Sequence, residues 1–195
     1  MDQPATAHDL KTPALACEID RDVRVLLSCP RSADADRLVD NLAANIARRH
    51  PVTIAAGRPA AKTAEIDRTL NEAQQVVESV DPDATDRTVH RLEDVHLRGL
   101  LTLLGDDERL RLFVARELDP LRDHPVLLDA VRALVRHPTS KSEAAASLHL
   151  SRPAFYDRLA KAERLLGVDL DDPDIRVSLH VALVANDLGA RPRNA

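Results

Sequence analysis

Residues 140–166 read SKSEAAASLHLSRPAFYDRLAKAERLL, and this stretch carries most of the structural information in the 195-residue chain. Ser140 and Glu143 form an S-x-x-E capping box, a pattern that fixes the first turn of a helix. The pattern predicts a short helix over residues 141–148. The face that this helix presents carries two alanines and a leucine: Ala144, Ala145 and Leu148. Small side chains on that face allow a second helix to cross closely.

A tight turn at His149 and Leu150 leads to a longer helix predicted over residues 152–166. Ser151 is its expected N-cap, and Pro153 lies in its first turn, where a missing N–H is tolerated. Four apolar residues at helical spacing form its expected buried face: Phe155, Leu159, Ala162 and Leu166. A short capped helix, a tight turn and a longer amphipathic helix are typical of a helix-turn-helix.

The second helix leaves polar side chains outside, and these are the candidate DNA-binding residues. Side chains near the N-terminus of such a helix reach base edges in the major groove, which Arg152 and Tyr156 are expected to contact. For Asp157 a salt bridge inside the helix is the default expectation, and a cytosine amine is the alternative partner. Three cations are expected to neutralise phosphates: Lys141, Lys161 and Arg164. Ser151 completes the candidate site.

Charge is distributed unevenly along the chain, although its formal total is −5. Residues 131–166 contain seven Lys or Arg and three Asp or Glu, so this segment carries +4 and the remainder −9. A nucleic-acid-binding surface needs such a basic segment, so the acidic total does not exclude DNA as a partner. On pattern and charge alone, a purely structural helical hairpin is an equal alternative.

Five sequence blocks follow one another between residues 98 and 188: Leu100-Leu101-x-Leu103-Leu104, Glu117-Leu118-x-Pro120-Leu121, Ser142-Glu143-Ala144-Ala145-x-x-Leu148, Tyr156-Asp157-Arg158-Leu159 and Glu163-x-Leu165-Leu166-Gly167-Val168-Asp169-Leu170-x-Asp172-Pro173. In order and spacing these blocks resemble the C-terminal helix-turn-helix domain of PucR/CdaR-type transcriptional regulators. The resemblance covers about ninety residues and implies sequence-specific binding to double-stranded DNA.

The chain departs from that family at two points. The family's recognition helix commonly opens with a His-Arg-Asn-Thr-Leu run, whereas this chain has Ser151-Arg152-Pro153-Ala154-Phe155. Only Arg152 and the apolar character of Phe155 are kept, so the operator sequence cannot be transferred from relatives. The family's long N-terminal sensor region is also missing, and we expect a truncated relative or one part of a split system.

Upstream of the helical half, residues 14–80 resemble the degenerate GGDEF-like domain that precedes this effector domain in the family. The expected elements are strands at 14–19 and 23–29 joined at Asp20–Asp22, a helix capped by Ser32 and ending near Arg49, a strand at 52–56, and a helix at 66–80. That last helix carries an apolar stripe of Ile66, Leu70, Ala73, Val77 and Val80. The order β-β-α-β-α predicts a small α/β unit.

The predicted fold class is α+β, with this α/β unit followed by an all-helical domain. Helical patterns cover residues 87–104, 107–118, 125–136, 141–148, 152–166 and 174–188. The predicted organisation is a disordered tail at 1–13, the GGDEF-like domain at 14–80, a linker at 81–86, the helix-turn-helix domain at 87–189 and a tail at 190–195.

Nothing in the sequence assembles a catalytic centre, so the chain is not expected to be an enzyme. The turn at Ile19–Val23 lacks the Gly-Gly pair and the upstream metal-binding Asp that diguanylate cyclase chemistry needs. Residues 57–62 lack the second glycine and the Lys-Ser/Thr ending of a phosphate loop. The eight histidines are scattered, and Cys17 and Cys29 are expected to be reduced. We therefore expect no metal and no cofactor.

The sequence as a whole predicts a cytoplasmic, DNA-binding transcriptional regulator that acts as a homodimer, with a possible small-molecule effector that the sequence does not identify. No apolar run approaches the roughly 20 residues that span a bilayer, and the first residues do not resemble a secretory signal. The expected dimer surface combines the α/β unit with the helix at 87–104, through Val89, Leu92, Val95, His96 and Leu100. The alternative is a protein-interaction or metabolite-sensing adaptor that has lost DNA binding, which Pro153-Ala154 and the acidic remainder motivate.

Overall fold

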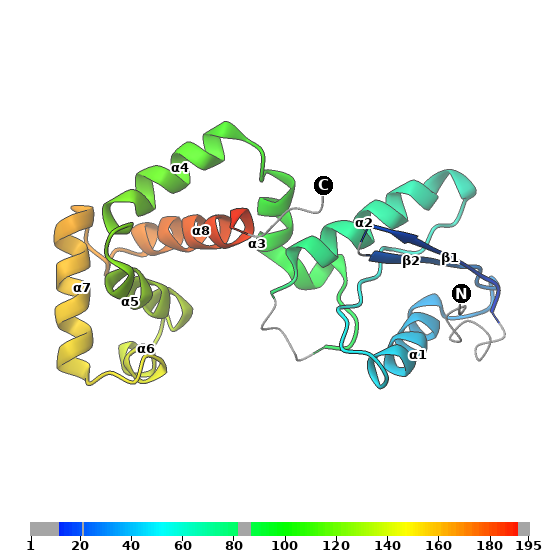
Figure 1. Ribbon diagram of the computed structural model, residues 1–195, viewed down its shortest axis with the longest axis horizontal. Coiled ribbons are helices and arrows are strands. Elements are labelled where there is room, and N and C mark those ends of the chain that lie inside the picture. Colours follow the sequence, from blue (N-terminus) through cyan, green and yellow to red (C-terminus); the bar gives the residue numbers. More distant parts are fainter. Residues whose placement is uncertain (1–11, 21, 82–86, 191–195) are drawn as a thin grey trace. The chain divides into compact units, whose positions relative to one another are not determined.

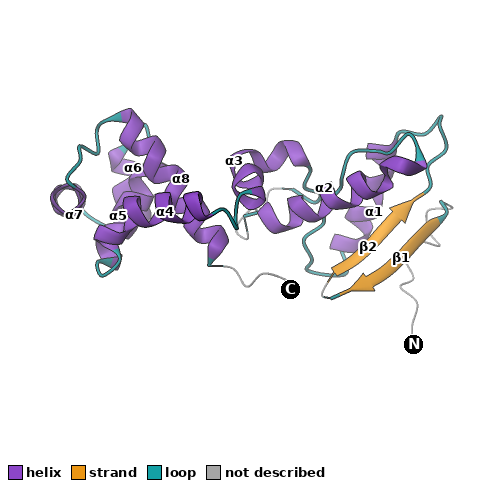
Figure 2. Ribbon diagram, turned by 90° about the horizontal axis from the view of Figure 1, so that it is seen from above, coloured by secondary structure: helices purple, strands orange, loops and turns teal. Residues whose placement is uncertain are grey.

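The computed structural model describes residues 12–20, 22–81 and 87–190, which divide into two compact units after Thr102 (Figure 1). We call them the N-terminal unit and the C-terminal unit. The predicted tails and the linker at 81–86 lie, apart from a few bordering residues, outside the described residues. The α+β fold class is confirmed, because strands occur beside helices in the first unit and the second is helical (Figure 2).

The N-terminal unit begins with an antiparallel hairpin of β1 (Ala14–Ile19) and β2 (Asp22–Leu27), in which Ala16 is paired with Val25. This confirms the predicted hairpin. Asp20 in the turn has a φ of 57°, a left-handed conformation that short-chain polar residues tolerate. The helices that follow are α1 (Ala35–Ala47), α2 (Ile66–Ser79), preceded by the 3₁₀ turn η1 (Thr63–Glu65), and α3 (Leu92–Leu103).

Two local predictions for this unit are wrong. Residues 52–56 do not form a strand, because their pairing is a single parallel bridge between Ala55 and His90. The segment around His90 enters α3 two residues later, so the bridge has no room to extend into a ladder. The N-cap of α1 is Asp34 and not Ser32, since the Asp34 carboxylate accepts from the Arg37 amide at 3.1 Å.

Helix α3 packs against α2 inside the N-terminal unit. Ser79 Oγ donates to Thr102 Oγ1 at 2.8 Å, and Arg98 Nε donates to the Ser79 carbonyl at 2.9 Å. Val76 and Val80 of this unit are buried together with Val95. Two residues expected on a dimer surface are therefore interior, with Val89 6% and Val95 4% exposed.

The buried face of α2 also differs from the predicted apolar stripe, which is only half-buried except for Val80. The fully covered helix positions are Glu72, Val76 and Ser79. Glu72 is buried because its carboxylate binds Arg58 in the connection before the helix. The Arg58 amide donates to Glu72 Oε2 at 2.9 Å, and the Arg58 guanidinium pairs with Glu72 Oε1. These bonds, led by the Arg58 side chain, lower the pKa of Glu72 to about 2.

The same connection needs glycine at position 57. A Cβ at Gly57 would lie 2.0 Å from the Thr69 carbonyl oxygen. Because that oxygen is a backbone atom, no side-chain movement could relieve the clash. Thr69 Oγ1 in turn donates to the Arg58 carbonyl at 2.8 Å. The segment at 57–62 is therefore fixed to α2.

In the described residues of the C-terminal unit, every secondary-structure element is helical. Its elements are α4 (Glu108–Leu118), the 3₁₀ turn η2 (Asp119–Leu121), α5 (Pro125–Arg136), α6 (Lys141–Ser147), α7 (Arg152–Leu166) and α8 (Pro173–Gly189). These bounds agree with the predicted helices to within a residue or so at each end. Helix α5 contacts α6, α7 and α8, while α4 packs on α8 (Figure 1). The core that they share includes Leu121, Leu134, Phe155, Leu170 and Leu179, all essentially inaccessible.

Candidate nucleic-acid interface

The start of α6 is fixed by Ser140, whose hydroxyl accepts from the Glu143 amide at 3.2 Å. The second bond of a full capping box is missing, because the Ser140 amide donates instead to the His137 carbonyl at 3.2 Å. The Glu143 carboxylate lies 3.8 Å from His137 Nδ1. The S-x-x-E pattern therefore predicts the helix start correctly, but only half of its hydrogen bonds form.

His149 occupies the turn between α6 and α7 with a φ of 54°. Its amide donates to the Ala146 carbonyl at 2.9 Å, and the Leu150 amide donates to the Ala145 carbonyl at 2.9 Å. This pair of bonds is the Schellman arrangement that ends helices in a left-handed residue, usually glycine. The backbone thus makes the sharp turn of a helix-turn-helix with histidine at the position that commonly holds glycine.

Helix α7 begins and ends where its sequence predicts. Ser151 Oγ accepts from the Ala154 amide at 3.4 Å, and Gly167, with a φ of 68°, closes the last turn by donating to the Glu163 carbonyl at 2.8 Å. Its buried face consists of Phe155, Leu159 and Ala162, as predicted, and Leu166 is half-buried beside them. One face of α7 is therefore fixed to the core and the opposite face is left to solvent.

The two alanines of α6 lie in the same core. Ala144 is fully buried and Ala145 is 1% exposed, in a cluster with Phe155 of α7 and Leu134 of α5. The neighbouring Ala146 is exposed. Small side chains thus occur at the covered positions of α6, which agrees with their predicted role in close packing.

Six of the seven candidate DNA-binding residues are exposed: Ser151, Arg152, Tyr156, Asp157, Lys161 and Arg164. Ser151 uses its hydroxyl as the helix cap. Asp157, Lys161 and Arg164 are spaced by four and three residues, so they share one face of the helix. Within the part of the chain that the structure describes, these two cations and Arg152 form no ion pair, and neither does Asp157. The face therefore offers free positive charge.

Lys141, the seventh candidate, has a different environment. Its ammonium group lies 2.6 Å from Asp171 Oδ1 and its side chain is only 28% exposed. The same nitrogen lies 5.5 Å from the centre of the Tyr156 ring. Lys141 thus connects the first residue of α6 with a carboxylate before α8 and an aromatic ring on α7.

Comparison with known proteins agrees with this geometry. The PucR C-terminal helix-turn-helix domain matches residues 127–185, which run from α5 into α8, and a GGDEF-like domain matches residues 4–79. The order of these two matches is that of the PucR-type regulator architecture. Its helix-turn-helix domain identifies a DNA-binding regulator family, as the sequence blocks predict. The N-terminal match is to a GGDEF-like domain, and the sequence of the hairpin turn in this chain contains no Gly-Gly pair.

Among curated proteins, the chain is similar to an uncharacterized protein, YsfB, of Bacillus subtilis (strain 168), with 27% identity over 167 residues. The aligned region is 82% of this chain and 44% of YsfB, so the chain spans less than half the length of that relative. No solved structure matches the chain. The described helices include none that is both long and apolar enough to cross a bilayer.

Sequence reasoning missed the residues that surround Lys141 in the PucR-type domain. Asp171 lies in the connection between α7 and α8 and Arg176 in the first turn of α8, with Arg176 Nη2 2.5 Å from Asp171 Oδ1. The hydrogen bond from Lys141 and the charge of both cations hold the pKa of Asp171 below its usual range. The run Asp169–Pro173 signals a helix start, and Asp172 indeed caps α8. Nothing in that run indicates which aspartate binds Lys141.

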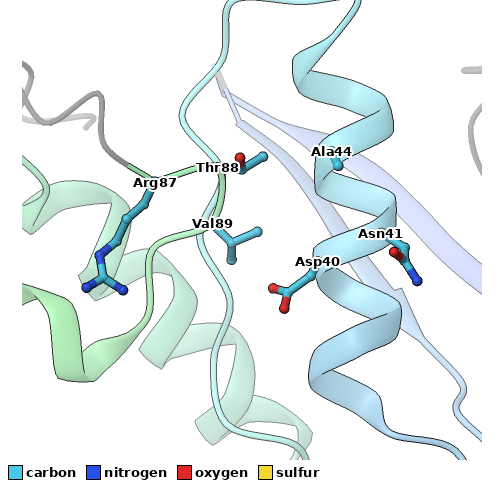
Figure 3. Close-up of a pocket in the computed structure, with 6 residues that line it drawn as sticks. All are labelled: Asp40, Asn41, Ala44, Arg87, Thr88 and Val89. Carbon is cyan, nitrogen blue, oxygen red and sulfur yellow. The ribbon is translucent and has the colours of Figure 1, made fainter.

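The N-terminal unit contains a cavity of about 440 Å³ lined by Asp40, Asn41, Ala44, Arg87, Thr88 and Val89 (Figure 3). Asp40 is engaged by Arg91 Nη2 at 2.7 Å, and Arg87 is directed away from α1 to Asp94 at 2.9 Å. The charged groups around this cavity are therefore paired with protein groups. The geometry favours the exposed face of α7 as the functional site.

Proposed function

We propose that the chain is a sequence-specific transcriptional regulator that binds double-stranded DNA in the cytoplasm as a homodimer, with α7 in the major groove, and that it is not an enzyme. The observation that carries the proposal is the exposed surface of α7, where Arg152, Lys161 and Arg164 have no carboxylate partner among the described residues. Free cations on the second helix of a PucR-type helix-turn-helix are suited to DNA.

The position of each side chain suggests its role. Arg152 and Tyr156 lie in the first two turns of α7, the part of a recognition helix that reaches base edges. Asp157 has its carboxylate free to accept from a cytosine amine. Lys161 and Arg164 lie farther along the same helix and are suited to phosphates, which position the protein without specifying sequence. Ser151 contributes by capping the helix that presents the others.

Homodimer formation follows from the number of recognition helices. The described residues of each chain contain one helix-turn-helix, and such domains commonly reach useful affinity by placing two of them on half-sites of one duplex. The dimer surface expected from sequence must be revised, because Val89 and Val95 are buried inside the N-terminal unit. Leu100, which is 55% exposed, is the apolar residue of that set still available to a partner.

The test is to select duplexes from a random-sequence DNA library with the full chain and to measure binding of the selected duplex over a range of salt. We expect nanomolar to micromolar affinity that falls steeply as salt rises. Lys161→Gln should reduce the slope of log K against log salt by about 0.9, because one phosphate contact is lost. Arg152→Ala should relax sequence preference.

Arg111→Gln is the matched control, since Arg111 is exposed on α4, outside the helix-turn-helix. This variant should keep the wild-type slope. If the full chain selects no duplex even at low salt, the DNA-binding proposal is overturned in favour of a protein-interaction or metabolite-sensing adaptor.

A further inference from the structure

Three segments of the C-terminal unit meet at one carboxylate. Asp171, in the connection between α7 and α8, receives the ammonium of Lys141 at 2.6 Å and the guanidinium of Arg176 at 2.5 Å. Lys141 is the first residue of α6, and Arg176 lies in the first turns of α8. We refer to Lys141, Asp171 and Arg176 as the Asp171 cluster.

Arg176 extends the cluster to the backbone on both sides of the helix-turn-helix. Its Nε donates to the Leu170 carbonyl at 2.6 Å, and its Nη1 donates to the Pro138 carbonyl at 3.4 Å. Leu170 is 1% exposed, so this end is anchored in the core. Pro138 precedes the Ser140 cap of α6. The cluster thus links the segment before the helix-turn-helix to the segment that follows it.

The cluster also reaches the recognition helix through Tyr156. The Lys141 ammonium lies 5.5 Å from the centre of the Tyr156 ring, within the range of a cation–π contact. Tyr156 is 49% exposed on α7, one helical turn after the free cation Arg152. An aromatic ring on an exposed helix face otherwise has several rotamers available, and a cation held against it favours one of them.

Lys141 is held there because Asp171 is ionised. The hydrogen bond from Lys141, together with the charges of Lys141 and Arg176, keeps the pKa of Asp171 below its usual range. A lysine whose charge is satisfied at 2.6 Å is poorly suited to be a phosphate contact as well. The arrangement suits a lysine that orients the neighbouring Tyr156 ring.

We propose that Asp171 is a positioning residue for DNA recognition, which holds Lys141 against Tyr156 and so orients the Tyr156 ring on α7 before DNA binds. The inference rests on the proposed function and adds a specific role for the Asp171 cluster. It predicts that the loss of Asp171 lowers sequence discrimination. A bystander carboxylate would behave differently, because the removal of a negative charge raises affinity for every DNA alike and leaves sequence discrimination unchanged.

The positional coupling can be measured without DNA. The chain contains one tyrosine and no tryptophan, so its tyrosine fluorescence reports on Tyr156 alone. We expect the time-resolved fluorescence anisotropy to gain a larger fast component in Asp171→Asn and in Lys141→Gln, because the ring is no longer held. Lys141→Arg should retain the wild-type decay, since arginine preserves the cation. Asp123→Asn, at an exposed aspartate of the same unit, is the matched control.

The effect on recognition is measured with the duplex selected by the full chain and with an unselected duplex of the same length. Asp171→Asn and Lys141→Gln should lower the ratio of the two affinities about threefold to tenfold. Neither variant should change the salt slope, whereas Lys161→Gln should reduce it. Lys141→Arg should restore the wild-type ratio.

The outcomes separate the two proposals. If the wild-type chain binds no duplex, the proposed function is overturned, and the role of the Asp171 cluster in recognition is overturned with it. If the wild-type chain binds but Asp171→Asn leaves either the anisotropy decay or the affinity ratio unchanged, only the positioning role is overturned. A slope reduced by about 0.9 in Lys141→Gln would instead make Lys141 a phosphate contact.

Discussion

Glu72 is the residue whose ionisation should most clearly affect the stability of the N-terminal unit. Its pKa is lowered from 4.5 to about 2, chiefly by the hydrogen bond from the Arg58 side chain. A lowered pKa means that the ionised form is favoured by folding. The stabilisation is therefore complete above pH 4.5 and is lost as pH falls toward 2. We expect a loss of about 2 kcal/mol, less than the full shift implies because Arg58 is exposed to solvent.

Glu72→Gln should remove this pH dependence and lower the free energy of unfolding at neutral pH by a similar amount. Urea unfolding followed by circular dichroism at several pH values gives the measurement, and tyrosine fluorescence monitors the C-terminal unit in the same sample. Glu65→Gln, at a carboxylate of the same unit that is 39% exposed, should keep the wild-type pH dependence. An equal loss of pH dependence in both variants would contradict the assigned role of Glu72.

At single residues, the sequence predicts burial and caps better than polar partners. The buried residues Phe155, Leu159 and Ala162 follow from helical spacing, since periodicity determines which side of a helix is apolar. Lys141 is different, because its partner Asp171 is thirty positions away and any of several nearby acids has the right charge. Which opposite charge it meets depends on how three helices pack, and no local pattern encodes that.

At the scale of elements, the helices of the C-terminal unit could be predicted closely, whereas the third strand could not and the helix predicted at 87–104 begins only at Leu92. Apolar spacing and capping residues lie within each helix, so α5 and α7 have the predicted bounds. A strand requires a partner of sufficient length, and the segment at 52–56 finds a single bridge to His90. The apolar stripe of α2 likewise fails to mark its buried face, because polar bonds of Glu72 and Ser79 cover a different side.

The packing of α6 gives a prediction at this scale. Ala145 is 1% exposed, whereas Ala146, the next residue on the same helix, is exposed. Ala145→Leu must insert extra carbon atoms into a filled core, and we expect the C-terminal unit to lose about 2 kcal/mol of unfolding free energy. Ala146→Leu should change it by less than about 0.5 kcal/mol. Urea unfolding followed by the fluorescence of Tyr156 measures both, and comparable losses would disprove close packing at Ala145.

At the scale of the whole molecule, the order of a GGDEF-like domain and a helix-turn-helix domain follows from the sequence, but the division of the chain does not. Helix α3 has its own apolar residues and by pattern suits either half. The structure pairs it with α2, through Gln75 Nε2 donating to the Gly99 carbonyl at 3.1 Å and through Ser79 to Thr102. Compact units are defined by such long-range contacts, which spacing along the chain cannot reveal.

The proposed homodimer makes a geometric prediction for the whole molecule on DNA. Two copies of α7 must meet the major groove on one face of the duplex, at half-sites separated by one or more turns of about 10.5 base pairs. Five base pairs inserted between the half-sites of the selected duplex place one of them on the opposite face, and affinity should fall at least about tenfold because the second contact is lost. Ten inserted base pairs restore the face and should cost less. Titration at constant salt, with light scattering to count two chains per duplex, measures the effect. A single chain per duplex, with affinity indifferent to the five-base-pair insertion, would show that each helix-turn-helix binds alone.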